Sequence, residues 1–342
     1  MENKRLHSID LLRIVATYMI CLIHVLNQGG VLRVATQGRL AYWFLFSVVY
    51  CAVNIYGIIS GYVDQDKPQN YTKLALMWLQ VVFFGFILCA VAQFVGYHRG
   101  TPIIQHLFPL ISNSYWYFTA YVPLYLVKPY LNKIFNDIDE KKGRELFWIL
   151  IVLTCLINFL SFDDTFKLNY GYSTLWLIVL YIIGKLLRKA HIFEKWSSVK
   201  LIGLLILLNV IQFIPYELYG DDIFYNYTSF TVVFSGIIFV VLFSRMKIES
   251  NLISKLSGYT LGIYLFQNNQ FVWEYLYNRF VFVAKYPALQ GMLYVFLIAL
   301  AIFAIGFVLE AIRKVIVFFN QIDDTVDYLL SRKKRLENGK IE

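Results

Sequence analysis

Charged residues are scarce in this chain. They make up only 15% of its 342 residues, whereas hydrophobic residues make up 59%. A soluble domain normally carries about a quarter charged residues, so this composition indicates a membrane protein. The longest polar segments are a loop at 137–144 and the tail after Phe319, and neither is long enough to form a soluble domain.

Cysteine is also rare, and its placement argues against two kinds of site. The four cysteines lie within apolar stretches, and no two of them form a CxxC pair. We therefore expect neither a disulfide framework nor a metal site. Their positions favour small buried hydrophobic side chains: Cys21, Cys51, Cys89 and Cys155.

Apolar blocks separated by short connectors fill most of the chain. About 20 apolar residues at a rise of 1.5 Å span a hydrocarbon core of roughly 30 Å. The sequence therefore predicts an all-α, polytopic transmembrane bundle of about ten helices. Pro123 and Pro129 are expected to break the fourth helix, and the sixth block is short. The blocks are 9–28, 40–62, 73–96, 114–131, 145–161, 173–187, 199–215, 228–244, 257–277 and 289–317.

The positive charges predict the orientation of the bundle. Cytoplasmic loops of membrane proteins collect Lys and Arg. With both the N-terminus and the C-terminus in the cytoplasm, most of the 31 Lys and Arg residues fall on the inner side. The outer segments then hold only Arg33, Arg39, Arg99, Lys167, Arg279 and Lys285. We expect a transmembrane domain at 1–317 and a basic cytoplasmic tail at 318–342.

The net charge of +9 does not point to nucleic acid, because the cations are spread over many loops rather than grouped on one face. Membrane lipids with anionic headgroups are the expected partners, and residues 331–335 of the tail offer one such site. A solvated run of charge explains that segment equally well. A signal peptide is the alternative for the first block, but its length and its polar residues argue against cleavage.

Polar residues within the first block are the strongest functional signal. Such residues are costly in a membrane and mark sites or pathways. At about 100° per residue, Asp10, Arg13, Thr17 and His24 fall on one side of one helix. Arg13 and His24 are then about 16 Å apart along the axis. The alternatives are an ordinary Asp10–Arg13 ion pair at the boundary and a structural histidine.

Four segments, taken together, resemble the integral-membrane acyltransferase 3 family, and the resemblance covers nearly the whole chain. The first segment opens at Leu6 and carries Arg13 followed by His24 in the first helix. The others are Ile58-Ile59-Ser60-Gly61-Tyr62, the aromatic and proline segment from Trp116 through Tyr125 and Pro129 to Asn132, and residues 256–265. One position departs from the pattern, since Gln267 stands where many members have a second histidine.

The resemblance implies an O-acyltransferase of the bacterial cytoplasmic membrane. It would move an acyl group, most simply acetyl, from acetyl-CoA or another acyl-CoA to a hydroxyl of a cell-surface polysaccharide or its lipid-linked precursor. The acyl-CoA would be a substrate, with no permanently bound cofactor. His24 would be the catalytic base or, as a second possibility, a transient acyl carrier. Asp10 would orient Arg13, which would bind the donor phosphates.

Three further residues are candidates for the donor site, each with an ordinary structural alternative. Ser60, next to Gly61, would let a ligand approach closely, although a glycine cap at the end of the second helix is the expected arrangement. Trp116 and Tyr125 would stack on adenine or a sugar, although aromatic residues also form interfacial belts.

Two other classes of function remain open. A transporter or flippase of lipid-linked sugars or a small solute also needs a polar stripe and a broken helix. A structural subunit of an assembly complex is the third reading, because Gln267 cannot titrate where relatives carry a histidine.

Overall fold

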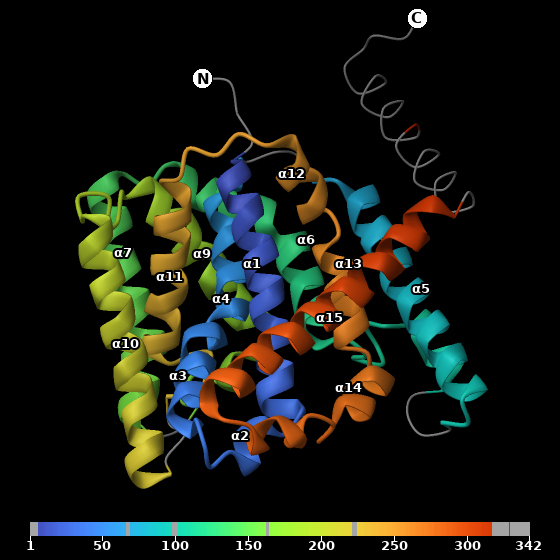
Figure 1. Cartoon of the computed structure of the whole chain (residues 1–342). Helices are drawn as coiled ribbons and strands as arrows, with labels where there is room; N and C mark the ends of the chain where they lie inside the picture. The colour runs from blue at the N-terminus through green and yellow to red at the C-terminus, as the bar shows by residue number, and fades with distance from the viewer. Residues whose placement is uncertain are drawn as a thin grey trace, which may run out of the picture.

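The computed structural model describes residues 6–65, 69–97, 102–161, 164–220, 224–316 and Tyr328. Within these residues every regular element is helical (Figure 1), which confirms the predicted all-α bundle. The helices are α1 (His7–Ile23), η1 (His24–Gln28), α2 (Val31–Val34), α3 (Arg39–Tyr50), α4 (Ala52–Tyr62), α5 (Tyr71–Phe94), η2 (Ile103–Leu107), α6 (Trp116–Asn136), α7 (Glu140–Ile151), η3 (Val152–Ile157), α8 (Asn158–Ser161), η4 (Asn169–Gly171), α9 (Thr174–Lys189), α10 (Ser198–Tyr219), α11 (Phe230–Ser244), α12 (Asn251–Ser257), α13 (Thr260–Gln267), α14 (Gln270–Leu276), η5 (Val281–Lys285) and α15 (Ala288–Val315).

Each predicted apolar block overlaps at least one of these helices, and several helices run past the predicted bounds, as α6 does by continuing to Asn136. Among the described residues, six helical spans are long and apolar enough to cross a membrane, and α11 is a shorter apolar helix. The chain is therefore a multi-pass membrane protein. The six spans are His7–Gln28, Arg39–Tyr62, Tyr71–Phe94, Glu140–Ser161, Ser198–Leu218 and Ala288–Val315.

The ninth block differs from the prediction, because it is not one continuous helix. It divides into α13 and α14 at Asn268-Asn269. The preceding helix, α12, ends at Ser257, where the block begins, and Gly258-Tyr259 separates it from α13. Gly and Asn are poor helix formers. The Asn269 side chain instead caps α14 by accepting a hydrogen bond from the Phe271 amide at 3.0 Å.

The fourth block (114–131) also differs from the prediction, because it is continuous where a break was expected. Pro123 and Pro129 both lie inside α6, which runs unbroken from Trp116 to Asn136. The predicted break is therefore wrong. Proline removes one backbone donor, but a side chain can satisfy the carbonyl that it frees.

A close crossing of α4 and α9 forms the middle of the bundle. A Cβ atom on Gly61 would lie 1.8 Å from the Tyr181 carbonyl oxygen, and one on Gly184 would lie 2.0 Å from the Ile58 carbonyl oxygen. Gly61 lies within α4 and has no positive φ. The expected glycine cap is therefore wrong, because this glycine permits two backbones to touch.

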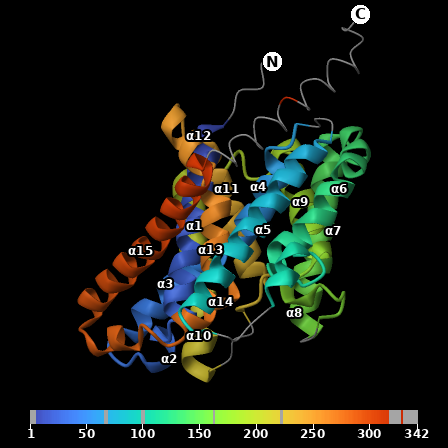
Figure 2. The same ribbon diagram turned by 90° about the vertical axis from the view of Figure 1, so that its right-hand side faces the viewer.

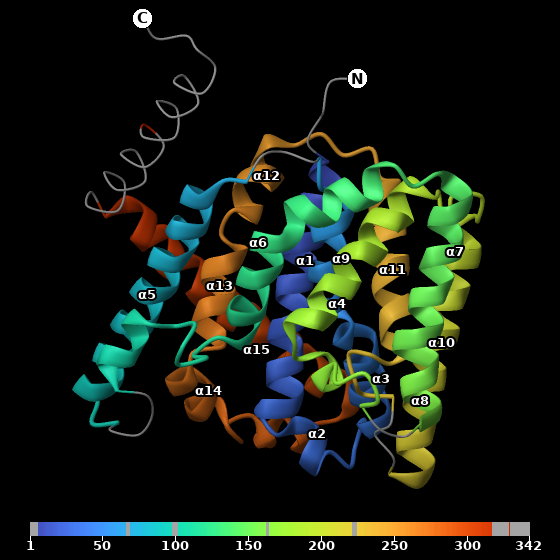
Figure 3. The ribbon, with the colours of Figure 1, turned by 180° about the vertical axis from the view of Figure 1, so that it is seen from behind.

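The first helix, α1, packs against α4 and also against α3, α11, α12, α13 and α15. Figure 2 shows α15 on one side of α1, with α6 and α7 on the opposite side. Figure 3 shows α5 at one edge of the bundle and α10 at the other. Exposed apolar side chains run along these outer helices, as expected for surfaces that face lipid; they include Ile87, Val91, Val199, Ile206, Leu293, Leu297 and Val308.

The first residues of α1 and the last residues of α15 lie at the same end of the bundle (Figure 1), as an even number of crossings requires. The predicted cytoplasmic position of this end stays a prediction. The proposed tail at 318–342 lies outside the described residues, apart from Tyr328.

Candidate active site

A large cavity opens between α1, α4, α5, α6 and the α12–α13 region. Its volume is about 1540 Å³. Every site residue predicted from the sequence lines it: Asp10, Arg13, His24, Ser60, Trp116 and Tyr125. Thr17 lines it as well, so the predicted polar stripe of α1 faces this cavity rather than lipid.

The ion pair of Asp10 and Arg13 occupies the N-terminal end of the stripe. The Arg13 Nη1 atom lies 2.5 Å from Asp10 Oδ1, and the second carboxylate oxygen accepts a hydrogen bond from Ser254 Oγ at 2.6 Å. Asp10 is buried, whereas 28% of the Arg13 side chain is exposed. The carboxylate is therefore the fixed partner, and it holds a guanidinium that stays accessible from the cavity.

Thr17, one turn after Arg13 in α1, lies beside Tyr56 of α4. The Thr17 hydroxyl donates to the Arg13 carbonyl at 2.8 Å, and the Tyr56 hydroxyl donates to the same carbonyl at 2.8 Å. The two hydroxyls also contact each other at 2.5 Å. Tyr56 thereby ties α4 to α1 beside the guanidinium, and the sequence analysis did not identify it.

His24 stands at the other end of the stripe, where α1 passes into the π-helical turn η1. Such turns are rare and are often found at functional sites. The imidazole is buried and packs edge-on against the Trp273 ring at 4.7 Å. Within the part of the chain that the structure describes, its Nδ1 atom has no hydrogen-bond partner. Gln28 fixes this tryptophan by donating to its carbonyl at 3.0 Å.

Gln267 lies next to both His24 and Cys21. Its side chain is fully buried, and neither its amide oxygen nor its amide nitrogen makes a hydrogen bond of normal geometry with any described residue. The position at which this chain departs from the family pattern is therefore adjacent to the one histidine of the stripe.

Ser60 and Tyr125 line the cavity, and their hydroxyls are both engaged with backbone. The Ser60 hydroxyl donates to the Tyr56 carbonyl at 2.9 Å, one turn earlier in α4. The Tyr125 hydroxyl donates to the Asn70 carbonyl at 2.9 Å. The Tyr125 carbonyl, which Pro129 leaves without its helical donor, accepts the Gln69 amide at 2.5 Å. These contacts fix the connector before α5 against α6.

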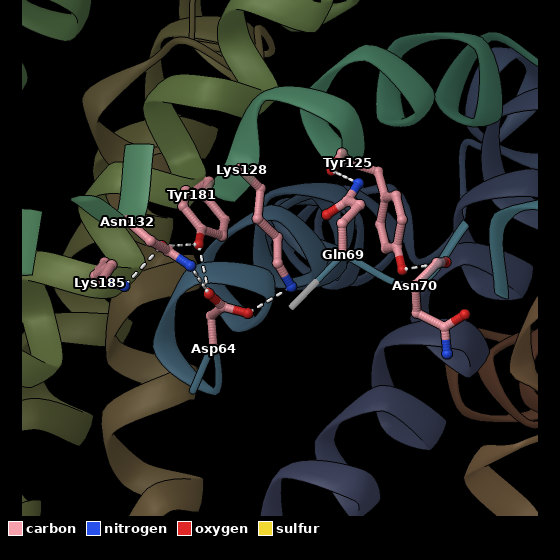
Figure 4. A network of polar contacts seen from close by, with 8 residues as sticks. All are labelled: Asp64, Gln69, Asn70, Tyr125, Lys128, Asn132, Tyr181 and Lys185. Carbon is pink, nitrogen blue, oxygen red and sulfur yellow. Dashed lines mark hydrogen bonds and ion pairs between the residues drawn. The ribbon is translucent and has the colours of Figure 1, made fainter. Parts of the chain in front are cut away.

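A network centred on Asp64 was missed by the sequence analysis (Figure 4). The carboxylate pairs with Lys128 Nζ at 2.5 Å and accepts the Tyr181 hydroxyl at 2.8 Å. It also accepts the Asn132 amide, whose oxygen in turn accepts Lys185 Nζ at 2.6 Å. The spacing of Lys128 and Asn132, and of Tyr181 and Lys185, gave a signal, since each pair lies one turn apart on one helix face.

The surroundings of Asp64 act on its pKa in opposite directions. Burial raises the pKa, but the hydrogen bond and charge of Lys128, with hydrogen bonds from Asn132 and Tyr181, outweigh burial and hold it below its ordinary value. The carboxylate is therefore ionised, and it anchors Lys128 at the wall of the cavity.

Positive side chains gather on this part of the cavity wall. Arg13, Lys73, Lys128 and Arg188 all line it, and among the described residues the acidic side chains that line it are Asp10 and Asp64. Arg188 also donates to the Tyr62 carbonyl at 3.2 Å. Several cations around one opening attract a polyanionic ligand such as a phosphorylated nucleotide.

A second buried acid–arginine pair lies away from the cavity. Glu310 binds Arg313 through two hydrogen bonds, of 2.9 and 3.0 Å, near the end of α15. Neither residue lines the cavity, so the pair has a structural role. Among the described residues, no group of three or more His, Cys, Asp or Glu side chains could hold a metal ion.

Comparison with known proteins identifies the family. The chain shows no significant match to a curated protein or to a solved structure. A family model described as an acyltransferase domain matches residues 6–311, which include every helix that lines the cavity. The chain therefore belongs to the acyltransferase 3 family of membrane proteins.

Proposed function

We propose that this protein transfers an acyl group, most simply acetyl, from acyl-CoA to a hydroxyl of a cell-surface glycan or of its lipid-linked precursor. Family membership implies acyl transfer. The observation that carries the proposal is that Arg13 and His24 line one continuous cavity. The expected setting is the bacterial cytoplasmic membrane, with the donor entering from the cytoplasmic side.

The size and charge of the cavity support a donor of this kind. Pockets for drug-sized ligands usually measure about 300–1,000 Å³, and this one reaches about 1540 Å³. Arg13 and Lys128 would bind the phosphates of coenzyme A. The pantetheine arm would extend along the stripe of α1 and bring the thioester to His24, about 16 Å away by helix rise.

The reaction needs a base for the acceptor hydroxyl and a nucleophilic attack by its oxygen on the thioester. The His24 imidazole would take the proton of the acceptor hydroxyl as its oxygen attacks the thioester carbonyl. The C–S bond then breaks, the acyl group stays on the acceptor oxygen, and the coenzyme A thiolate leaves and takes the proton from the imidazolium. Asp10 would orient Arg13 without itself contacting the reacting atoms.

A transporter or flippase is the second candidate, and the broken ninth block favours it. Interrupted helices with polar groups near the membrane midplane are typical of secondary transporters. The break between α13 and α14 at Asn268-Asn269 lies between Gln267 and Trp273, which both neighbour His24. Under that reading the cavity would bind a solute or a lipid-linked sugar and move it without chemical change.

Radiolabelled acetyl-CoA separates the two candidates. Membranes that contain the protein are incubated with the label, and matched membranes without it are the control. Protein-dependent label in extracted glycan or glycolipid supports the transferase. No label, together with saturable solute uptake, would contradict it and support transport. Loss of the O-acetyl NMR signals of the surface polysaccharide on gene deletion would then identify the acceptor.

A further inference from the structure

Four aromatic side chains from four separate segments meet in one wall of the cavity, which we call the aromatic wall: Tyr50, Trp116, Tyr172 and Tyr227. Trp116 lies 4.7 Å from Tyr172 between ring centroids, and Tyr172 lies 5.0 Å from Tyr227. Tyr50 stacks on Tyr227 at 5.1 Å with an interplanar angle of 22°. All four line the cavity, so they do not form a belt at the lipid interface.

Buried polar contacts hold this wall in place. Asn54 is fully buried in α4, donates to the Tyr227 carbonyl at 2.7 Å, and accepts the Trp176 indole N–H at 3.1 Å. The Tyr227 amide donates to the Tyr170 carbonyl at 3.2 Å. One asparagine of α4 thus links the first turn of α9 to the segment before α11.

Gly171 allows the segment that holds Tyr170 to approach the segment that holds Tyr227. Its φ is +98°, and a Cβ atom there would lie 2.3 Å from Tyr227 Cβ. The close approach of these two segments therefore requires glycine at this position. The aromatic wall is an ordered part of the cavity and depends on specific residues outside it.

The wall lies far from the cations that suit the donor phosphates. Trp116 begins α6, and Lys128 lies twelve residues later in the same helix, a separation of about 18 Å at 1.5 Å per residue. Adenine is bonded to the phosphorylated ribose of coenzyme A, so it would remain near the phosphates. The aromatic wall is therefore free for another ligand.

We propose that the aromatic wall is the acceptor subsite, and that it binds the apolar face of a pyranose ring. Trp116, which the sequence analysis assigned to the donor, would then contact the acceptor. Aromatic rings offer broad apolar faces against which the C–H face of a sugar packs. The amides of Asn27 and Asn268, which line the same cavity, supply hydrogen bonds for hydroxyls. This inference rests on the proposed acyl transfer.

The test compares the two substrates in steady-state kinetics of the full-length protein in nanodiscs. The donor is acetyl-CoA, and the acceptor is the host's surface polysaccharide after mild alkaline de-O-acetylation. For Trp116→Ala and Tyr172→Ala we expect the KM for the polysaccharide to rise about tenfold and the KM for acetyl-CoA to change less than twofold. Trp116→Phe should recover most of the wild-type value.

Tyr130→Ala is the matched control. Tyr130 lies in the same helix as Trp116 and is exposed, but it does not line the cavity, so its replacement should leave both KM values unchanged. If Trp116→Ala does not fold, the test rests on Tyr172→Ala, because Tyr172 is half exposed and its replacement disturbs less packing.

Two results would overturn the proposal separately. A raised KM for acetyl-CoA with an unchanged KM for the polysaccharide would assign the wall to the donor. An absence of wild-type transfer, with acetyl-CoA binding intact by equilibrium dialysis, would remove the proposed function and this subsite with it.

Discussion

The Gln69 side chain donates to the Tyr125 carbonyl at 2.5 Å, and this is the carbonyl that Pro129 deprives of its helical donor. A residue of the connector before α5 thus supplies the hydrogen bond that lets α6 continue through a proline. The contact also fixes Tyr125 and its neighbour Lys128 at the cavity wall.

A double-mutant cycle tests this relationship. Gln69→Ala alone should lower stability by about 1 kcal/mol, because it leaves a buried carbonyl unsatisfied. In a Pro129→Ala background the same change should cost less, since the restored amide donates to the Tyr125 carbonyl. Melting temperatures in detergent measure both effects. Equal costs in the two backgrounds would show that the contact does not compensate for the proline.

Asp10→Asn should raise the KM for acyl-CoA about fivefold to tenfold while the protein stays folded. The change keeps the shape of the side chain but removes the charge that fixes Arg13. Glu310→Gln is the matched control, since it alters another i,i+3 acid–arginine pair away from the cavity. That variant should lose stability and keep its KM. Equal KM values for the Asp10 variant and the wild type would refute the orienting role.

Acid should weaken the fold partly through Asp64. Because its pKa in the folded protein lies below the ordinary value of 3.8, ionised Asp64 stabilises the fold above that pH. This contribution is lost as the pH falls through the lowered pKa. The melting temperature of Asp64→Asn should therefore fall less between about pH 5 and pH 3 than that of the wild type. Parallel curves for the two proteins would contradict this assignment.

The crossing of α4 and α9 should tolerate no Cβ atom at Gly61. Gly61→Ala should cost about 1–3 kcal/mol, because the backbone carbonyl of Tyr181 has to move away. Gly203→Ala in α10 is the control, since a Cβ atom there meets nothing within 4 Å and alanine favours helix. We expect that variant to be as stable as the wild type or slightly more stable. A similar change in stability in both variants would show that the crossing does not set the effect at Gly61.

Much of this arrangement could be predicted from the sequence because its signals are local. The length of apolar runs gave the helical blocks, and 3.6-residue periodicity placed Asp10, Arg13, Thr17 and His24 on one face. All four line the cavity.

The missed features depend on contacts between distant segments. Nothing near Asp64 in the sequence indicates that Lys128 and Tyr181 will surround it, and Trp273 meets His24 only after the chain has folded. Gly61 looked like a helix cap because α9, against which it packs, lies more than a hundred residues later. Pro129 looked like a helix break because the compensating Gln69 belongs to another segment.

The central claim is that the His24 imidazole drives acyl transfer in the cavity lined by Arg13. The most direct test is the initial rate of label transfer from radiolabelled acetyl-CoA to de-O-acetylated polysaccharide, with wild-type protein and His24→Ala at equal amounts of folded protein. The exposed His191→Ala variant is the control. Loss of the base should lower the rate about 10²–10⁴-fold, with the control unchanged. A His24→Ala rate equal to that of the wild type would contradict the account.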